Sequence, residues 1–554
     1  MKVNPWVATI FLALLCTHSI QAQKKEEKEI FTHQDTLRGS IGPGRMGWDV
    51  LKYDISVQPN FETKTLKGIN KLSYYDTGVR LMQLDLQEPM QIDSILKSGK
   101  KISFNREGNV YWVSLRDTAA MNKIKPHRDA ISIYFSGKPK EAIRPPWDGG
   151  WIWQKDKNGN PWMTVACQGL GASVWYPCKD VQSDEPDSGA ILRITVPDSL
   201  MAVGNGRLTE KKAAGKGYTT YTWTVKRPIN NYCIVPYIGK YVHFGEIYKA
   251  EKGPLSMDYW VLDYNVDKAK TQFKDAPRMM KAFEHWFGPY PFYADGYKLV
   301  EAPHLGMEHQ SAIAYGNGYQ NGYAGKDLSA SGWGLKWDFI IVHESGHEWF
   351  GNNITSKDIA DMWIHESFTN YSETLFTDYY YGKKAGDEYV IGTRKRISND
   401  IPIIGRYGVN NEGSGDMYYK GGNMLHNIRQ VINNDEKFRQ ILRGLNSTFY
   451  HQTVTSAQVE NYISKKSHID FSKVFDQYLR TVQIPVLEYN VKGYTLKYRY
   501  SNCVPGFNMP LLIHFKGNRW IKPTEDWKIL SLYPEGDSSF SVDNNFYINT
   551  KKVD

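Results

Sequence analysis

The sequence predicts a multidomain α+β protein with a β-rich N-terminal part, a mainly helical middle and a β-rich C-terminal part. Two observations carry this prediction. With 554 residues the chain is too long for a single hydrophobic core. The spacing of its apolar residues also changes twice along the chain, from the alternation typical of strands to helical spacing and back again. Hydrophobic residues at 41% and charged residues at 23% are ordinary values for a globular protein.

The first 22 residues have the pattern of a secretory signal peptide. Lys2 supplies a positive charge, residues 6–16 form an apolar run, and residues 20–22 (Ile-Gln-Ala) offer a cleavage site with a small residue. This run is too short for a permanent membrane span, and no other segment is apolar over a sufficient length. We therefore expect an exported protein, either periplasmic or secreted. A buried N-terminal helix and a lipoprotein processed at Cys16 are the alternatives.

A flexible lead-in and an N-terminal β domain are expected after the signal peptide. Residues 23–45 are polar and contain several glycines, which is typical of a flexible segment. Over residues 46–250, short runs of alternating apolar residues follow one another, separated by turn residues about every eight to twelve positions. The clearest of these runs are residues 53–57, 69–75, 81–86, 131–135, 191–196 and 218–225.

Helical spacing dominates residues 251–484. A strand is expected at residues 297–302, and helices are expected at residues 269–287, 335–350, 362–381, 385–399, 421–433 and 435–450. A further helix opens at Thr455, because Gln458 three residues later completes a capping-box pattern. We interpret this region as a separate domain.

Strand-like alternation returns over residues 485–554. Apolar runs at residues 487–491, 495–500, 510–515 and 527–532 suit a small β-sandwich. No C-terminal helical domain is expected after it. The net charge of +9 is modest, and no nucleic-acid-binding module accompanies the short basic runs, so we exclude nucleic acid as a partner.

The segment H-E-S-G-H at residues 343–347 carries the chemistry of the central region. Residues four apart share one face of a helix, so His343 and His347 can hold one metal ion. Glu344 is placed to act on a water molecule at that metal, as in the H-E-x-x-H zinc peptidases. With Glu366 on the next helix as third ligand, one position stays open for water, whereas structural zinc sites have four protein ligands. These residues predict a zinc hydrolase with one zinc ion per chain.

Four segments together resemble peptidase family M1, the gluzincin aminopeptidases, which include aminopeptidase N and leukotriene-hydrolase-like enzymes. The first is the zinc motif together with Glu366, which follows it after eighteen intervening residues. Residues 305–309 (Leu-Gly-Met-Glu-His) are similar to the Gly-Ala-Met-Glu-Asn exopeptidase motif, and residues 418–421 resemble its Tyr-x-Lys-Gly segment. Residues 167–169 (Cys-Gln-Gly) are similar to a glutamine-bearing loop of the leukotriene-hydrolase branch. The resemblance implies a thermolysin-like α/β catalytic domain.

The resemblance also implies roles for residues that bind the substrate. Glu308 would bind the free α-amine of a peptide, with Gln168 helping from the β domain. A carboxylate suits this task because it neutralises an ammonium group and orients it through charge-assisted hydrogen bonds. Gly306 and Met307 would lie along the substrate. The implied partners are thus peptides with a free N-terminus.

Two further roles concern the reaction itself. Glu344 would act as general base and later return the proton to the leaving nitrogen. Tyr418 would donate a hydrogen bond to the oxyanion of the tetrahedral species. Packing of the Tyr418 ring alone is the alternative. The function predicted is that of a zinc-dependent aminopeptidase.

Some features stay open at this point. Residues 305–309 depart from the family motif at Leu305, Gly306 and His309, which leaves the preferred first residue open. A zinc endopeptidase, a non-catalytic binding protein with the same fold, and an epoxide hydrolase are the competing functions. The four cysteines that follow the signal peptide are expected to be buried free thiols, although disulfide pairs are an alternative in an exported protein: Cys167, Cys178, Cys233 and Cys503. Oligomeric state is also open.

Overall fold

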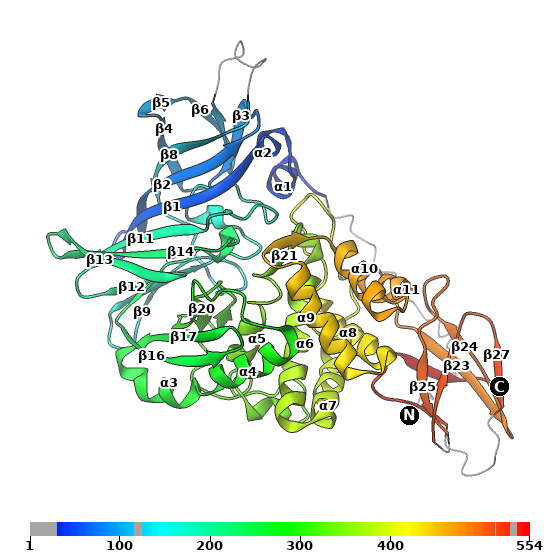
Figure 1. Cartoon of the computed structure of the whole chain (residues 1–554). Coiled ribbons are helices and arrows are strands. Elements are labelled where there is room, and N and C mark those ends of the chain that lie inside the picture. The colour runs from blue at the N-terminus through cyan, green and yellow to red at the C-terminus, as the bar shows by residue number, and fades with distance from the viewer. Residues whose placement is uncertain (1–29, 116–124, 516, 532–539) are drawn as a thin grey trace, which may run out of the picture.

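The fold is described by a computed structural model over residues 30–115, 125–515, 517–531 and 540–554. A β-rich N-terminal region and a small C-terminal β region flank a helical region (Figure 1). The predicted multidomain α+β fold class is thereby confirmed. The expected signal peptide at residues 1–22 lies outside the described residues. Within the described ranges, no helix has the length and apolar character needed to cross a bilayer.

Two short helices precede the first strand: α1 (His33–Gly39) and α2 (Pro43–Met46). Thr32 and Asp35 cap α1 reciprocally, each side chain bonding the backbone N–H of the other. The flexible lead-in expected over residues 23–45 is therefore partly helical. Composition missed this because Gly39, Gly42 and Gly44 dominated the segment, while the Thr-x-x-Asp cap is a local signal.

An eight-stranded sheet forms the body of the N-terminal region, in the order β13-β14-β11-β1-β2-β8-β4-β5. Its strands are β1 (Trp48–Asn60), β2 (Thr65–Asp76), β4 (Gln91–Lys97), β5 (Lys100–Ile102), β8 (His127–Gly137), β11 (Ala190–Pro197), β13 (Arg207–Gly215) and β14 (Tyr218–Val225). Neighbours are antiparallel except β1 and β11, which are parallel. Every second residue of β2 is buried, as expected for a sheet with one face on a core.

Two smaller sheets complete this region, with orders β3-β7-β6 and β12-β15-β10-β9. Their strands are β3 (Leu81–Asp85), β6 (Phe104–Glu107), β7 (Val110–Ser114), β9 (Gly150–Lys155), β10 (Pro161–Ala166), β12 (Met201–Val203) and β15 (Tyr237–Gly239). The loop after β10 carries Gln168 and leads into the 3₁₀ turn η2 (Ala172–Val174). Gln168 thus lies two residues after the end of β10.

The helical region begins with a five-stranded sheet, ordered β16-β17-β18-β20-β19. The strands are β16 (Tyr241–Ala250), β17 (Gly253–Leu262), β18 (Tyr297–Glu301), β19 (Gly306–Met307) and β20 (Ile313–Tyr315). The domain boundary expected at residues 250–251 falls in the turn of the β16–β17 hairpin, whose strands pair over their whole length. This sheet therefore begins at Tyr241. Its edge strand β19 carries two of the predicted substrate-binding residues.

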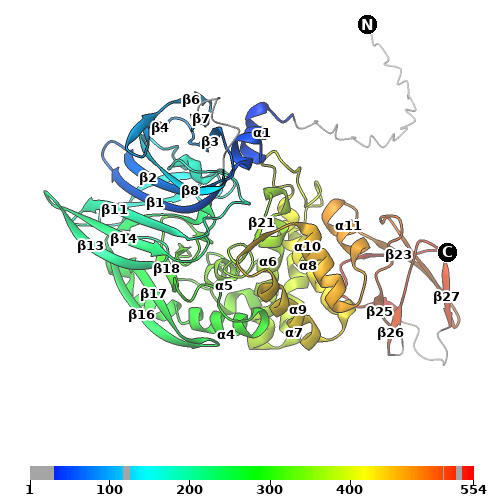
Figure 2. The same cartoon turned by 45° about the horizontal axis from the view of Figure 1, so that its top comes forward.

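Helices pack against this sheet and extend away from it (Figure 1, Figure 2). They are α3 (Val266–Gln272), α4 (Asp275–Phe287), α5 (Phe339–Gly346), α6 (Trp363–Tyr381), α7 (Lys383–Thr393), α8 (Tyr419–Ile432), α9 (Asp435–Thr448), α10 (Ser456–Ser467) and α11 (Ser472–Arg480). Every residue of α6 from 363 to 377 is buried, which makes it the central helix. The helix expected over residues 269–287 is interrupted between α3 and α4, and α11 was not predicted.

The C-terminal region has two small sheets, ordered β27-β24-β23-β29 and β26-β25-β28. Their strands are β23 (Val486–Lys492), β24 (Thr495–Ser501), β25 (Leu511–His514), β26 (Asn518–Ile521), β27 (Lys528–Ser531), β28 (Ser541–Val542) and β29 (Asn549–Lys552). Their core continues into that of the helical region, where Tyr478 donates a hydrogen bond to the carbonyl of Tyr547 at 2.5 Å. Residue 532, the end of the last predicted strand, lies outside the described residues.

The four cysteines among the described residues are free thiols. Cys167, Cys178 and Cys233 are buried, and Cys503 is partly exposed. Burial raises the pKa of the Cys503 thiol to about 11, which disfavours the reactive thiolate. The prediction of buried free thiols therefore agrees with three of the four positions.

Candidate active site

Helix α5 presents the zinc motif from a buried position, and Asp338 fixes its start. The Asp338 carboxylate accepts a hydrogen bond from the backbone N–H of Ile341 at 3.2 Å, which is an N-cap. Tyr315 and Asn317 also donate to this carboxylate, at 2.7 Å and 2.9 Å. Burial raises the pKa of Asp338 to about 7. The helix is thus tied directly to strand β20.

The regular helix ends sooner than the sequence suggested, at Gly346 rather than at residue 350. His347 is the C-cap residue and keeps helical backbone angles, φ −64° and ψ −21°. The spacing of His343 and His347 is therefore still that of one helical turn, although the helix is shorter than predicted. The chain then turns, with the N–H of Phe350 donating to the Gly346 carbonyl at 3.2 Å.

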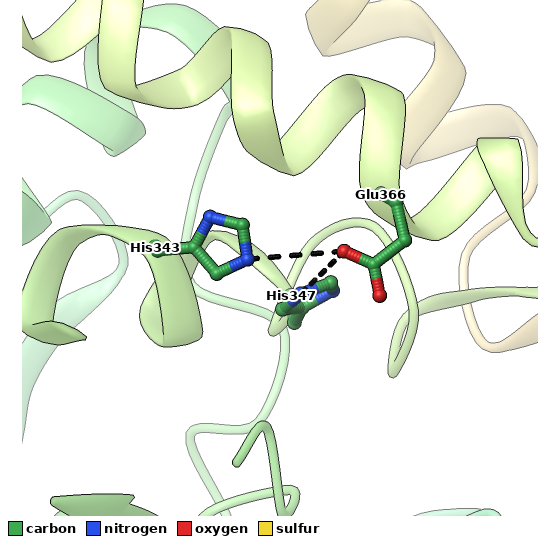
Figure 3. A group of neighbouring side chains, drawn as sticks. All are labelled: His343, His347 and Glu366. Atoms are coloured by element: carbon green, nitrogen blue, oxygen red, sulfur yellow. Dashed lines mark ion pairs between the residues drawn. The ribbon is translucent and has the colours of Figure 1, made fainter. Parts of the chain in front are cut away.

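His343, His347 and Glu366 point toward one another (Figure 3). The Glu366 Oε2 atom lies 3.8 Å from His343 Nε2 and 3.4 Å from His347 Nε2. All three side chains are buried, and Glu366 Oε2 has no hydrogen-bond partner. A buried carboxylate oxygen without a partner, facing two imidazole nitrogens, fits a bound cation. Two nitrogens and one oxygen with a fourth position open are the donor set of a catalytic zinc ion.

Hydrogen bonds to the other ring nitrogens orient both imidazoles. His343 Nδ1 lies 2.7 Å from Glu373 Oε1, and His347 Nδ1 lies 3.0 Å from the Phe350 carbonyl oxygen. Since both partners are acceptors, each Nδ1 carries the proton and each Nε2 is left as the ligand atom. Glu373, on α6, also accepts hydrogen bonds from Tyr389 at 2.6 Å and Asn370 at 3.1 Å.

Glu373 was missed by the sequence analysis. It lies seven residues after Glu366 on the same buried helix, so both side chains project from nearly the same face. The seven-residue spacing could be seen in the sequence, but only the structure of the buried helix shows that both carboxylates face the metal site. Burial raises the pKa of Glu373 to about 8.

The protein creates a strongly negative potential at this site. Burial opposes protonation of His347, yet the carboxylates of Glu366 and Glu308 outweigh it and raise its pKa to about 10. Burial and the nearby charge of Glu308 raise the pKa of Glu344 well above its usual value. The buried carboxylates of Glu308, Glu344 and Glu366 repel one another, and a divalent cation between them would stabilise their charged forms. The charge distribution therefore agrees with the donor set.

Glu308 lies beside the metal site and is held from the N-terminal region. Its Oε1 atom accepts hydrogen bonds from Gln168 Nε2 and from the Tyr232 hydroxyl, the latter at 3.1 Å. Asn352 donates to its backbone carbonyl at 2.9 Å. The structure thus brings together Gln168 and Glu308, as expected, and adds Tyr232. No motif pointed to Tyr232, which lies in the short 3₁₀ turn η3 (Asn231–Cys233).

Gly306 and Met307 form the edge strand β19, next to Glu344. A Cβ atom at position 306 would lie 2.5 Å from Glu344 Oε1 and 2.9 Å from Ile340 Cγ2. Only glycine fits there without a shift of Glu344, which gives a reason for the departure from the family alanine. His309, the other departure, is buried and its Nδ1 atom lies 2.6 Å from the Tyr237 hydroxyl, away from the metal ligands.

Tyr418 is the N-cap residue directly before helix α8, and its ring lies near the metal ligands. Its ring lies 6.1 Å from that of His343. Burial and the charge of Glu366 raise the pKa of Tyr418 well above 10, so the hydroxyl remains protonated and can donate. Lys420 points elsewhere, donating to the Thr481 carbonyl at 2.8 Å.

A cavity of about 900 Å³ connects these groups to solvent. Both halves of the molecule line it, since residues of the N-terminal region face the edge strand, α5 and the loop before α8. The lining residues that were not singled out from the sequence include Trp147 and Glu412. Trp147 is 70% exposed, an unusual state for a tryptophan at a cavity rim.

Comparisons with known proteins agree with this geometry. Residues 272–478 match the model of the peptidase family M1 domain. "Probable aminopeptidase 2" of Sulfurisphaera tokodaii is 22% identical over 497 residues, covering 84% of this chain and 59% of that protein. Leukotriene A-4 hydrolase of Xenopus laevis is 22% identical over 325 residues, covering 55% of this chain and 49% of that protein. The chain thus spans about half of these curated relatives' length.

A solved structure shows the same fold. The M1 zinc metallopeptidase from Deinococcus radiodurans aligns with a TM-score of 0.63 and 21% identity, over 76% of this chain and 91% of that one. The matched domain contains both histidines, Glu344, Glu366, Glu308 and Tyr418. Residues 272–478 therefore match the peptidase family M1 domain, and the chain shares its fold with an M1 zinc metallopeptidase.

Proposed function

We propose that the protein is a zinc-dependent aminopeptidase that removes the N-terminal residue of peptides. One observation carries the proposal: atoms of Glu308, Glu344 and His347 lie within 4.8 Å of one another. In a peptide, the α-amine and the first carbonyl carbon are separated by two bonds. A substrate whose amine meets Glu308 therefore has its first peptide bond beside Glu344 and the metal ligands.

The residues of the chain divide the work. Zinc, when bound by His343, His347 and Glu366, supplies a Lewis acid that polarises the substrate carbonyl and acidifies water. Glu344 takes the proton of the attacking water and returns it to the leaving nitrogen. Tyr418 donates to the developing oxyanion, an interaction of about 3 kcal/mol in the transition state.

The amine subsite explains why the enzyme acts at a chain end. Glu308 is buried and accepts bonds from two neutral donors, so it has no cationic partner among the contacts described above. An incoming ammonium group supplies the missing positive charge. An acetylated N-terminus has no charge and keeps a single N–H donor in place of three, and we expect it to be rejected.

Hydrolysis of leucine p-nitroanilide against its N-acetyl derivative tests this proposal. The purified protein should hydrolyse the free-amine substrate, lose activity with a chelator and regain it with zinc. Equal hydrolysis of the acetylated substrate would contradict the exopeptidase assignment and favour an endopeptidase.

We also propose that the protein is exported. The support is the N-terminal pattern: Lys2, the apolar run of residues 6–16 and the small residue Ala22. N-terminal sequencing of the protein from fractionated cells should start at residue 23 in the periplasm or the medium. An intact N-terminus in the cytosolic fraction would contradict export.

A further inference from the structure

Helix α1 packs against two loops that contribute to the cavity lining, residues 167–171 and residues 405–413. Residues 168–170 of the first loop and residues 410–413 of the second line the cavity. The first loop carries Gln168 and the second carries Asn410 and Glu412. Both loops contact α1, although they are far from it in sequence and belong to different regions of the molecule.

Arg38, near the end of α1, holds the first loop through both terminal nitrogens. Nη1 donates to the Leu170 carbonyl at 2.5 Å and to Asp180 at 3.1 Å, and Nη2 donates to the Gly169 carbonyl at 3.1 Å. The Arg38 side chain is 21% exposed and that of Asp180 is 5% exposed, so water competes weakly for these bonds. The planar guanidinium fixes the two consecutive carbonyls that follow Gln168.

The second loop packs on the next residue of the helix, Gly39. A Cβ atom there would lie 2.2 Å from the backbone nitrogen of Asn410, so a side chain does not fit without moving the loop. Asn410 Nδ2 donates to the Gly169 carbonyl at 3.2 Å, the same carbonyl that Arg38 binds. Helix α1 and the two loops therefore form one hydrogen-bonded unit.

Helix α1 is a rigid support because it is bonded to the neighbouring structure. Gln83, on β3, donates to the Leu37 carbonyl at 3.0 Å. Arg45 donates to the carbonyls of Arg38 and Ser40 at 2.8 Å and 2.9 Å. Arg45 also forms a fully buried ion pair with Asp85 at 2.7 Å.

We propose that Arg38 is a positioning residue of the amine subsite: it fixes loop 167–171 so that the Gln168 amide meets Glu308. The proposal rests on the aminopeptidase function and extends it to a residue at the N-terminal end of the described chain. Arg38 itself does not contact the substrate. Its effect passes through the loop to Gln168 and from there to Glu308.

The loop needs such a support. Gly169 and Gly171 have φ angles of +70° and +102°, which glycine adopts freely and leaves just as freely. Without Arg38, Gln87 still donates to the Leu170 carbonyl at 2.7 Å and Asn410 still donates to the Gly169 carbonyl. The loop then keeps its conformation on average but becomes more mobile. We therefore expect substrate binding to weaken more than the rate of the chemical step.

The variant Arg38→Ala tests this with leucine p-nitroanilide as substrate. We expect KM to rise about tenfold with kcat within about threefold of wild type, because ground-state binding of the amine is what weakens. Arg38→Lys keeps the charge opposite Asp180 but lacks the planar guanidinium that bonds two carbonyls. Its KM should therefore lie between those of wild type and Arg38→Ala. Arg193→Ala is the matched control, since Arg193 pairs with Asp54 in the same region without contacting the loop, and its KM should equal that of wild type.

A double-mutant cycle separates positioning from a general loss of stability. If Arg38 acts through Gln168, Arg38→Ala should leave KM unchanged within about twofold in a Gln168→Ala background. A full tenfold effect in that background would overturn the proposal. So would a wild-type KM in both Arg38 variants.

Amide hydrogen exchange gives a readout that needs no turnover. The Gly171 N–H donates to the Cys167 carbonyl at 2.6 Å inside the loop, and its exchange should be at least tenfold faster in Arg38→Ala or Arg38→Lys. Unchanged exchange overturns the positioning role. An inactive wild-type protein with faster loop exchange in the variants would instead contradict the aminopeptidase function alone.

Discussion

The metal centre and the amine subsite are neighbours built in opposite ways. The metal centre draws His343, His347 and Glu366 from two consecutive helices, with Glu373 on the second helix as support. The amine subsite joins Glu308 at a sheet edge to Gln168, which lies 140 residues earlier in the chain. The first depends on local helix geometry, whereas the second depends on how two regions of the molecule pack.

This contrast predicts how each responds to substitution. Damage to the metal centre should act on zinc binding or on the chemical step. Damage to the amine subsite should act on substrate binding and on the preference for a free N-terminus, with zinc content unchanged.

The largest effect is expected for Glu344→Gln. The substitution keeps the shape of the side chain and removes its ability to take a proton, so kcat should fall by about 10³-fold. Zinc content, measured by atomic absorption, should remain at one ion per chain because Glu344 is not one of the three proposed ligands. Loss of zinc in this variant would show that Glu344 is itself a ligand.

Glu308→Gln should have the next largest effect. Losing the charge removes a charge-assisted hydrogen bond to the ammonium group, which corresponds to a decrease in kcat/KM of about 10- to 100-fold. The ratio of activities on free and N-acetylated substrates should fall by the same factor. An equal decrease on both substrates would place Glu308 in the chemical step instead.

Glu373→Gln should weaken the metal centre without touching the substrate. The glutamine still accepts from His343 Nδ1 but no longer increases the basicity of the ring, so zinc affinity should fall about tenfold or somewhat more. Competition with a chromophoric chelator measures this directly. At saturating zinc, kcat should be close to wild type; a lasting loss would mean that Glu373 also affects the reaction.

The same contrast explains what the sequence could and could not predict. The spacing of His343 and His347 encodes their shared face, and only a helix is needed to read it. The pairing of Gln168 with Glu308 was predicted only from the resemblance to a family, since no periodicity relates residues 140 positions apart. Tyr232 had no motif at all, because its contact arises from the packing of a 3₁₀ turn against the sheet edge.

Fold prediction succeeded where a local sequence pattern determines an element and failed where the structure depends on contacts between distant segments. Alternation and helical spacing identified most strands and helices, and the Thr455–Gln458 capping box marks the start of α10 as expected. The hairpin β16–β17 was divided between two domains, because alternation is the same in both sheets and cannot show which neighbour a strand pairs with. Helix α1 was missed because the glycine-rich composition of its segment outweighed the local capping signal of Thr32 and Asp35.

The smallest effect separates the two sites most sharply. In Gln168→Ala, Glu308 keeps its charge and its bond from Tyr232, so the amine still binds, but the carboxylate loses one of two side-chain donors. A hydrogen bond to a charged carboxylate is worth about 1.5 kcal/mol, which corresponds to a KM increase of about tenfold. Zinc affinity and kcat should be unchanged. Steady-state kinetics at saturating zinc measures KM and kcat, and competition with a chromophoric chelator measures zinc affinity. A change in zinc affinity would mean that the two sites are coupled through Glu308, whose charge also acts on His347. The two sites would then be built from different elements but would not bind their ligands independently.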